Sequence, residues 1–115
     1  MDRLEDLKEK VRKFRDDRNW SQFHNHKDLA LSISIEASEL LEHFHWKNGS
    51  ELDAAAEEKR QAIEEELADV FVNTILLADK LEMDLVDIAS RKLAKNEAKY
   101  PVEKSMGKSA KYSEL

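Results

Sequence analysis

The stretch LALSISIEASELLEHFHW, from Leu29 to Trp46, decides the fold that the sequence predicts. Wound as a helix, it carries an apolar stripe on one side, made of Leu29, Ile33, Ala37, Leu40 and Phe44. Leu31 and Ile35 lie on the opposite side. A helix that is apolar on two sides packs between neighbours, so we expect this segment to be the central helix of a helical protein.

Two pairs of acidic residues follow helical spacing. Glu36-x-x-Glu39 lies at the edge of the stripe, and Glu66-x-x-Asp69 follows in EEELADVF. Residues three apart lie on one face of a helix, so each pair directs two carboxylates to one place. Carboxylates beside a core are costly to bury unless a cation or hydrogen bonds compensate them. Four oxygen ligands from two helices suit a hard divalent cation, and the pattern predicts a magnesium site.

A Glu-x-x-Glu pair taken alone is usually a solvated helix face. The second pair changes this, because it also flanks an apolar stripe, here made of Ile63, Leu67, Val70, Phe71, Thr74 and Ala78. Glu42-x-x-His45 resembles half of a di-iron carboxylate motif. That motif needs a second copy, which the loop residues His24 and His26 do not supply, so a di-iron site is disfavoured.

The composition points to a single all-α domain covering residues 1–115. Charged residues make up 38% of the 115 residues, Gly occurs twice and Pro once, and no segment alternates with the period of a strand. The balance of 19 basic and 25 acidic residues argues against binding to a nucleic acid polymer. Without cysteine, a signal peptide or a long apolar run, we expect a soluble cytoplasmic protein with no membrane partner.

Four helices with short connections are expected, which together form a bundle. Asp28 and Asp84 are the expected N-caps of the second and fourth helices, and Pro101 ends the fourth. Residues 102–115 are polar and aperiodic, so we expect a tail or flap. The four helices are predicted over about residues 2–18, from 28 to near 48–49, 54–81 and 85–99.

This bundle has more apolar surface than its own helices cover. The central helix is apolar on two sides, and Val72 and Leu76 lie on the far side of the third helix. A symmetric dimer would bury these faces, so we expect tight dimerisation.

Four segments, in order and at fitting spacing, carry a family resemblance: NWSQFH (19–24), IEASELLEHFHW (35–46), EEELADVFVN (65–74) and KNEAKYP (95–101). With them the chain resembles the all-α nucleoside triphosphate pyrophosphohydrolases of the MazG-like superfamily, most of all the dCTP pyrophosphatase type. The resemblance implies a Mg²⁺-dependent enzyme, with Mn²⁺ as a substitute, that splits (d)NTP into (d)NMP and pyrophosphate. It also implies nucleotide-pool house-cleaning with dCTP-like or dATP-like substrates, in a homodimer or a dimer of dimers.

The resemblance also implies roles for particular residues. The metal ligands would be Glu36, Glu39, Glu66 and Asp69; the base pocket would include Phe14, Trp20 and Trp46; and Lys92, Lys95, Asn96 and Tyr100 would face the phosphates. Glu39 is our candidate for combined metal ligand and general base. Stacking tolerates any base, so discrimination needs hydrogen bonds, for which His24 and Asn73 are candidates. Asn73 stands where the family often has a tyrosine.

Two simpler interpretations stay open. Trp20 and Trp46 also suit core or dimer packing, and the lysines of the fourth helix also suit its C-terminal dipole. A non-enzymatic alternative is a helical dimeric adaptor or an antitoxin-like partner protein. It would use the dimer surface and the tail, and it needs no carboxylates at the edge of the core.

Overall fold

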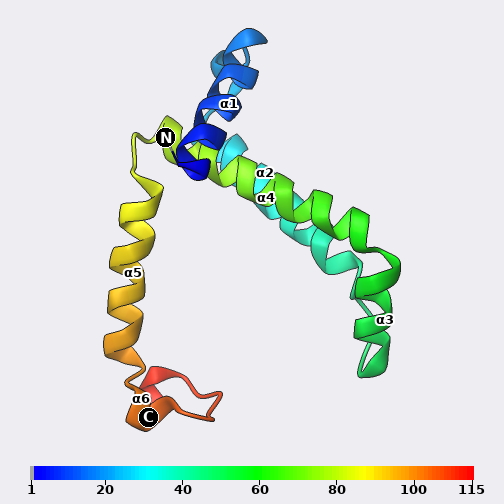
Figure 1. The fold of residues 1–115 in the computed structure, drawn as a ribbon, viewed down its shortest axis with the longest axis vertical. Helices are drawn as coiled ribbons and strands as arrows, with labels where there is room; N and C mark the ends of the chain where they lie inside the picture. The colour runs from blue at the N-terminus through cyan, green and yellow to red at the C-terminus, as the bar shows by residue number, and fades with distance from the viewer. Residues whose placement is uncertain (1) are drawn as a thin grey trace. The chain divides into compact units, whose positions relative to one another are not determined.

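The computed structural model describes residues 2–115, and these are helical with no β-strand among them. This confirms the all-α prediction. None of the helices described is long and apolar enough to cross a membrane. In chain order the elements are α1 (Arg3–Asp17), a 3₁₀ turn (Ser21–Phe23), α2 (His26–Glu42), α3 (Ser50–Glu58), α4 (Arg60–Lys80), α5 (Leu85–Lys99), α6 (Val102–Ser105) and a 3₁₀ turn (Tyr112–Glu114), as Figure 1 shows.

Helix α2 begins earlier and ends earlier than predicted. Its N-cap is Asn25, whose Oδ1 accepts a hydrogen bond from the Asp28 backbone N–H at 2.8 Å, so the predicted Asp28 cap is wrong by three residues. At the other end, His43 N–H donates to the Leu40 carbonyl, which tightens the last turn. Trp46 then takes a left-handed φ of 68°, well before the predicted stop at Asn48.

The predicted third helix is two helices. Lys59, with φ −106° and ψ 24°, separates α3 from α4. Hydrogen bonds continue on both sides of the break, from Lys59 N–H to the Ala55 carbonyl and from Ile63 N–H to the Lys59 carbonyl. No Gly or Pro marks the position, so the sequence pattern continues where the backbone turns. The prediction of one helix over residues 54–81 was therefore wrong at this point.

The chain forms two compact units, and the first ends at Glu82. In this N-terminal unit α2 and α4 run side by side in opposite directions (Figure 1), and α1 and α3 pack against α4. The core is thin: no large side chain among the described residues is fully buried. Leu31 and Ile35, on the second apolar side of α2, are each 50% exposed in the single chain. The buried apolar residues are Val11, Leu29, Ala55, Ile75, Leu76 and Ala78.

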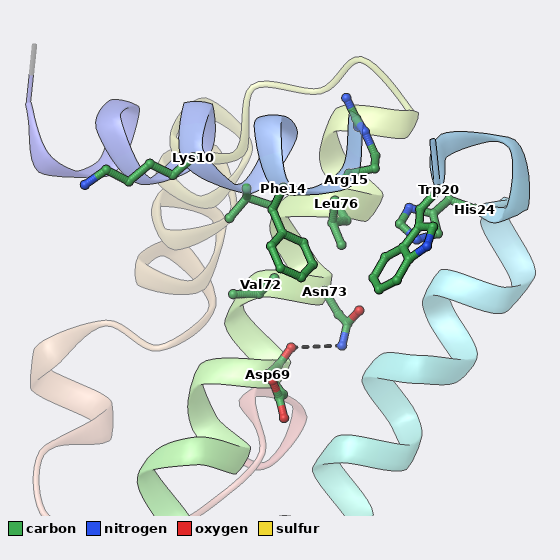
Figure 2. A pocket seen from close by; sticks show the side chains of 10 residues that line it. Lys10, Phe14, Arg15, Trp20, His24, Asp69, Val72, Asn73 and Leu76 are labelled. Carbon is green, nitrogen blue, oxygen red and sulfur yellow. Dashed lines mark hydrogen bonds between the residues drawn. The ribbon is translucent and has the colours of Figure 1, made fainter. Parts of the chain in front are cut away.

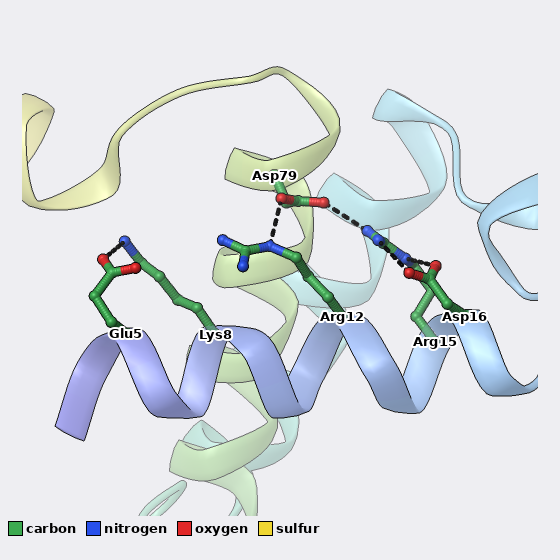
Figure 3. A network of polar contacts seen from close by, with 6 residues as sticks. All are labelled: Glu5, Lys8, Arg12, Arg15, Asp16 and Asp79. Carbon is green, nitrogen blue, oxygen red and sulfur yellow. Dashed lines mark hydrogen bonds and ion pairs between the residues drawn. The ribbon is translucent and has the colours of Figure 1, made fainter. Parts of the chain in front are cut away.

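Helix α1 is tied to α4 by ion pairs as well as by apolar contacts (Figure 3). Asp79 on α4 accepts from Arg12 Nε at 2.9 Å and from Arg15 Nη1 at 2.6 Å. Arg15 also donates from Nε to Asp16 at 2.8 Å. Partial burial opposes ionisation of Asp79, but the hydrogen bonds from Arg15 and Arg12 hold its pKa below the usual value. This charged network fixes α1 along α4.

The C-terminal unit, Met83–Leu115, is described by itself. Asp84 caps α5 as predicted, accepting a hydrogen bond from the Asp87 backbone N–H at 3.1 Å. Helix α5 ends before Pro101, also as predicted. The segment expected to be a tail or flap contains α6 and the last 3₁₀ turn. Within it Tyr112 lies edge-on to Tyr100, with ring centroids 6.2 Å apart.

Candidate active site

The site is built where α2 and α4 pack together. Helix α2 supplies Glu36 and Glu39, one turn apart, and α4 supplies Glu66 and Asp69 with the same spacing. Helices α2 and α4 pack side by side, although Leu67 and Phe71 of the predicted α4 stripe remain 53% and 44% exposed. As a result, acidic groups about 30 positions apart in the sequence meet on facing helices.

Three of the predicted ligands form a tight carboxylate cluster. Glu36, Glu39 and Glu66 each offer an oxygen, and these oxygens all lie within 4.8 Å of one another. The three side chains are half-buried, and with all the carboxylates ionised Glu66 Oε2 is buried with no hydrogen-bond partner among the described residues. A buried carboxylate oxygen without a partner is costly, and a cation would remove that cost. This all-oxygen donor set fits a hard divalent ion such as Mg²⁺.

The closeness of the carboxylates raises the pKa values of Glu36 and Glu66. Hydrogen bonding with Glu66, loss of solvation and the charge of Glu39 raise the pKa of Glu36 to about 7. The pKa of Glu66 is also raised: its hydrogen bond with Glu36 lowers it, but burial and the Glu39 carboxylate outweigh that effect. Without a cation the cluster therefore retains a proton near neutral pH, and a bound cation would have to displace it.

Asp69, the fourth predicted ligand, lies outside the tight cluster. Its side chain is exposed, and its charge adds to the forces that raise the pKa values of Glu36 and Glu66. Its backbone carbonyl accepts a hydrogen bond from Asn73 Nδ2 at 3.0 Å. Asp69 also lines the adjoining pocket. It therefore stands between the carboxylate cluster and that pocket.

The pocket adjoining Asp69 has a volume of about 490 Å³ (Figure 2). Its walls come from α1, from the residues on either side of the 3₁₀ turn, and from α4. Of the predicted base-contacting residues, Phe14, Trp20, His24 and Asn73 are among its lining residues. The others are Lys10, Val11, Arg15, Asp69, Val72 and Leu76.

Two aromatic rings form part of the pocket wall. The rings of Phe14 and Trp20 meet edge to face, with centroids 5.6 Å apart and an interplanar angle of 78°. Arg18 Cζ lies 3.8 Å from the Phe14 ring centroid and supports that ring from outside the pocket lining. Both rings remain about half exposed, so an aromatic face is open to a flat ligand such as a nucleobase.

His24 is the polar residue on the loop side of the pocket. Its Nδ1 is buried and has no hydrogen-bond partner among the described residues. Partial burial, followed by the positive charges of Arg15 and Lys80, lowers its pKa. The ring is therefore neutral at pH 7, and a neutral imidazole has one donor and one acceptor nitrogen.

Trp46, predicted as a base-contacting residue, is not among the residues that line this pocket. Its side chain is 87% exposed and stacks on His45, with centroids 4.4 Å apart and planes 11° apart. Its contact with a base stays a prediction. So do the phosphate contacts of four residues at the end of the C-terminal unit's α5: Lys92, Lys95, Asn96 and Tyr100.

Sequence reasoning did not assign five of the pocket residues. Lys10 and Arg15 read as members of a solvated charged face on α1, and nothing in their spacing distinguishes them. Val11 was expected in the core face of α1, and Val72 and Leu76 on the far side of the third helix. Leu76 is buried within the single chain, so the expectation that it needs a second copy to cover it was wrong for this residue; it lines the pocket together with Val72.

Comparison with known proteins gives consistent results. Residues 31–115 match the profile of the MazG-like family. The chain is 36% identical over 114 residues to dCTP pyrophosphatase 1 of Mus musculus, covering 97% of this chain and 67% of that protein. Its identity to dCTP pyrophosphatase 1 of Homo sapiens is 34%, with the same coverage.

A solved structure is also similar. A crystal structure of a pyrophosphatase from Archaeoglobus fulgidus superposes with a TM-score of 0.83 at 41% sequence identity, covering 88% of this chain and 94% of that one. Together these comparisons confirm the enzyme class inferred from the sequence, a nucleotide pyrophosphohydrolase, over the adaptor interpretation. The chain belongs to the MazG-like family.

Proposed function

We propose that this enzyme is a Mg²⁺-dependent nucleoside triphosphate pyrophosphohydrolase that acts on dCTP-like or dATP-like substrates. It releases the nucleoside monophosphate and pyrophosphate, and so removes unwanted nucleotides from the pool. The observation that carries the proposal is the carboxylate cluster with the buried, unpartnered Glu66 Oε2. An aromatic-walled pocket adjoins it along the same face of α4.

The metal would be held by Glu36, Glu39 and Glu66, with Asp69 at the edge nearest the pocket. When bound, Mg²⁺ supplies neutralising charge for the phosphate oxygens and lowers the pKa of a coordinated water. Four acidic residues can hold more than one ion, because Mg²⁺ keeps several of its waters. The half-burial of the three glutamates limits competition from bulk water at this position.

The chain's own residues have the remaining roles, which are proton transfer and binding of the base and the phosphates. Glu39 accepts the proton of the attacking water, a role that fits its place in the cluster and the absence of His from it. Phe14 and Trp20 hold the base in the pocket by stacking. Lys92 and Lys95, with Asn96 and Tyr100, supply positive charge and hydrogen bonds to the phosphates.

The active form is a homodimer or a dimer of dimers. Support comes from the apolar surface that the single chain leaves open on both helices of the central pair. Leu31 and Ile35 on α2 and Leu67 on α4 are each at least half exposed, and Phe71 is 44% exposed. So much open apolar surface around a thin core is typical of a chain that completes its core with a second copy.

A panel of (d)NTPs with pyrophosphate detection, with MgCl₂ or EDTA, tests the proposal. We expect cleavage only with the divalent ion. Glu39→Ala should reduce kcat by about 10²–10⁴-fold with its far-UV circular dichroism unchanged. Glu57→Ala, on the exposed face of α3, is the matched control and should retain activity. Retained turnover in Glu39→Ala would overturn the site assignment.

The melting temperature separates the enzyme from the adaptor. MgCl₂ and a nucleotide bind only the folded state of the enzyme, so both should raise its melting temperature. A wild-type protein that shows no shift with either ligand, and no cleavage of any (d)NTP, would favour the adaptor.

A further inference from the structure

One hydrogen bond orients the side-chain amide of Asn73. The atom that lies 3.0 Å from the Asp69 carbonyl oxygen is Nδ2, one turn further along α4. An amide oxygen has no hydrogen to donate, so only the NH₂ group can occupy this place. The hydrogen bond therefore determines which end of the amide points away from the Asp69 carbonyl: Oδ1 is free to accept, and one of the two Nδ2 hydrogens is already used.

Oδ1 of Asn73 is an unused acceptor at the pocket. Within residues 2–82 no donor bonds to it, while Asn73 lines the pocket beside Val72 and Leu76 (Figure 2). The two cations of the lining are occupied elsewhere. Lys10 Nζ lies 3.0 Å from Asp6, and Arg15 binds Asp16 and Asp79. A bound ligand is thus the natural source of a donor for Oδ1.

The order of residues along α4 says which part of a nucleotide meets Asn73. Glu66, Asp69 and Asn73 lie on successive turns of one face, and the seven helical steps from Glu66 to Asn73 span about 10 Å. With phosphates at the carboxylate cluster, the sugar is level with Asp69. The base then reaches Asn73 and the ring of Trp20.

We propose that Asn73 selects nucleotides whose base carries an exocyclic amino group on its pairing edge, by accepting a hydrogen bond from that group at Oδ1. This rests on the proposed function. Cytosine and adenine present an NH₂ donor at positions 4 and 6, whereas uracil, thymine, guanine and hypoxanthine present a carbonyl acceptor there. Against Oδ1 a carbonyl leaves two acceptors facing each other without a hydrogen between them.

The orientation of the amide is what makes the selection one-sided. A freely rotating asparagine would turn its NH₂ toward a carbonyl base and accept both classes. Here that turn would break the bond to the Asp69 carbonyl and bring two oxygens together. At the place that Oδ1 occupies, Asn73 therefore offers the base only an acceptor.

Paired substrates test this, because dCTP and dUTP, like dATP and dITP, differ at the amino-carbonyl position while sharing sugar and phosphates. For the wild type we expect kcat/KM to favour the amino member of each pair roughly tenfold or more. Asn73→Leu keeps the approximate size and removes the acceptor, so both ratios should fall to within about twofold of unity. Without catalysis, dCMP should raise the wild-type melting temperature more than dUMP, and Asn73→Leu should lose this difference.

Thr74→Val is the matched control. Thr74 donates from Oγ1 to the Val70 carbonyl at 2.7 Å, the same kind of bond on the same helix, but it does not line the pocket. This variant should keep the wild-type ratios. Cleavage of every nucleotide at similar rates, or unchanged ratios in Asn73→Leu, would overturn the role of Asn73 while leaving the hydrolase intact. Absence of cleavage of any triphosphate would instead overturn the proposed function.

Discussion

Arg15 Nη1 and Asp79 Oδ2 lie 2.6 Å apart and join α1 to α4 at the wall of the pocket. The same carboxylate binds Arg12, so one acidic residue holds two arginines of α1. Arg15 itself lines the pocket. The position of Phe14, its neighbour in sequence, therefore depends on a charge located on another helix.

Asp79→Asn should loosen this junction. The side chains of Arg15 and Asp79 are largely shielded from water, so we expect a loss of about 1–2 kcal/mol in the free energy of unfolding. Urea denaturation measures it, and KM should rise because Phe14 is less firmly placed. Glu64→Gln breaks the exposed Arg60–Glu64 pair and should cost less than about 0.5 kcal/mol. Equal effects of the two variants would show that the junction is unimportant.

The carboxylate cluster gives the metal-free protein a characteristic pH dependence. The folded pKa of Glu36, about 7, is above its ordinary 4.5, so its stabilising contribution is complete below about pH 4.5 and is lost as pH rises to 7. In EDTA this contribution should therefore lower the melting temperature as the pH rises from about 4.5 to 7. In Glu36→Gln the melting temperature should depend less on pH over this range. Because a proton competes with the metal, the rise in melting temperature on adding MgCl₂ should be larger at pH 8 than at pH 6.

Trp20 should contribute to substrate binding more than to the chemical step. Loss of base stacking in Trp20→Ala removes an interaction made equally before and during reaction, so KM should rise roughly tenfold with kcat little changed. Steady-state kinetics with dCTP measures both constants. Phe23 is also an exposed aromatic residue of the same loop but does not line the pocket, so Phe23→Ala should leave KM unchanged. A fall in kcat alone for Trp20→Ala would contradict the stacking role.

The second apolar side of α2 should be the contact between copies. The monomer mass is 13.4 kDa, and light scattering after gel filtration should give twice or four times this value for the wild type. Leu31→Lys places a charge on that side and should shift the mass toward the monomer. Val102→Lys, at an even more exposed apolar residue outside the N-terminal unit, should not. A monomeric wild type would refute the assembly.

The cap of α2 offers a test of local stability. Asn25 Oδ1 is the acceptor for the Asp28 backbone N–H, so Asn25→Ala should cost about 1 kcal/mol of unfolding free energy. Thermal or urea denaturation measures the loss. Asp28→Ala leaves the Asn25 acceptor in place, so it should cost less unfolding free energy than Asn25→Ala. If Asp28 were the cap, as the sequence predicted, Asp28→Ala would instead cost more.

The periodic parts of the sequence were predictable because burial imposes their spacing. The stripe beginning at Leu29 and the two acidic pairs indicated which faces of α2 and α4 meet, and the carboxylate cluster follows from that contact. The cap of α5 by Asp84 was also predictable, since a single acidic residue precedes a clear apolar repeat. Family motifs added the proposed base-binding roles of Phe14 and Trp20, which no spacing rule provides; both residues line the pocket.

The features that the sequence did not predict depend on the path of the backbone, which the residue types alone do not determine. The break at Lys59 occurs between good helix formers, so propensity gives no warning. Asn25 and Asp28 are both competent caps, and only the chain path selects between them. The acceptor role that we propose for Asn73 depends on one hydrogen bond to a carbonyl, which a sequence cannot display.

From residue 2 to residue 115 no large side chain is fully buried, and this has a consequence for how long the protein survives in a cell. With the proposed pairing, folding and association become one equilibrium, and the unfolded fraction grows as copies become scarce. Newly made chains at low abundance would meet proteases before they meet each other. The expression level would then determine both the specific activity and the half-life of the protein. Halving expression would reduce the amount of folded, assembled enzyme by more than half.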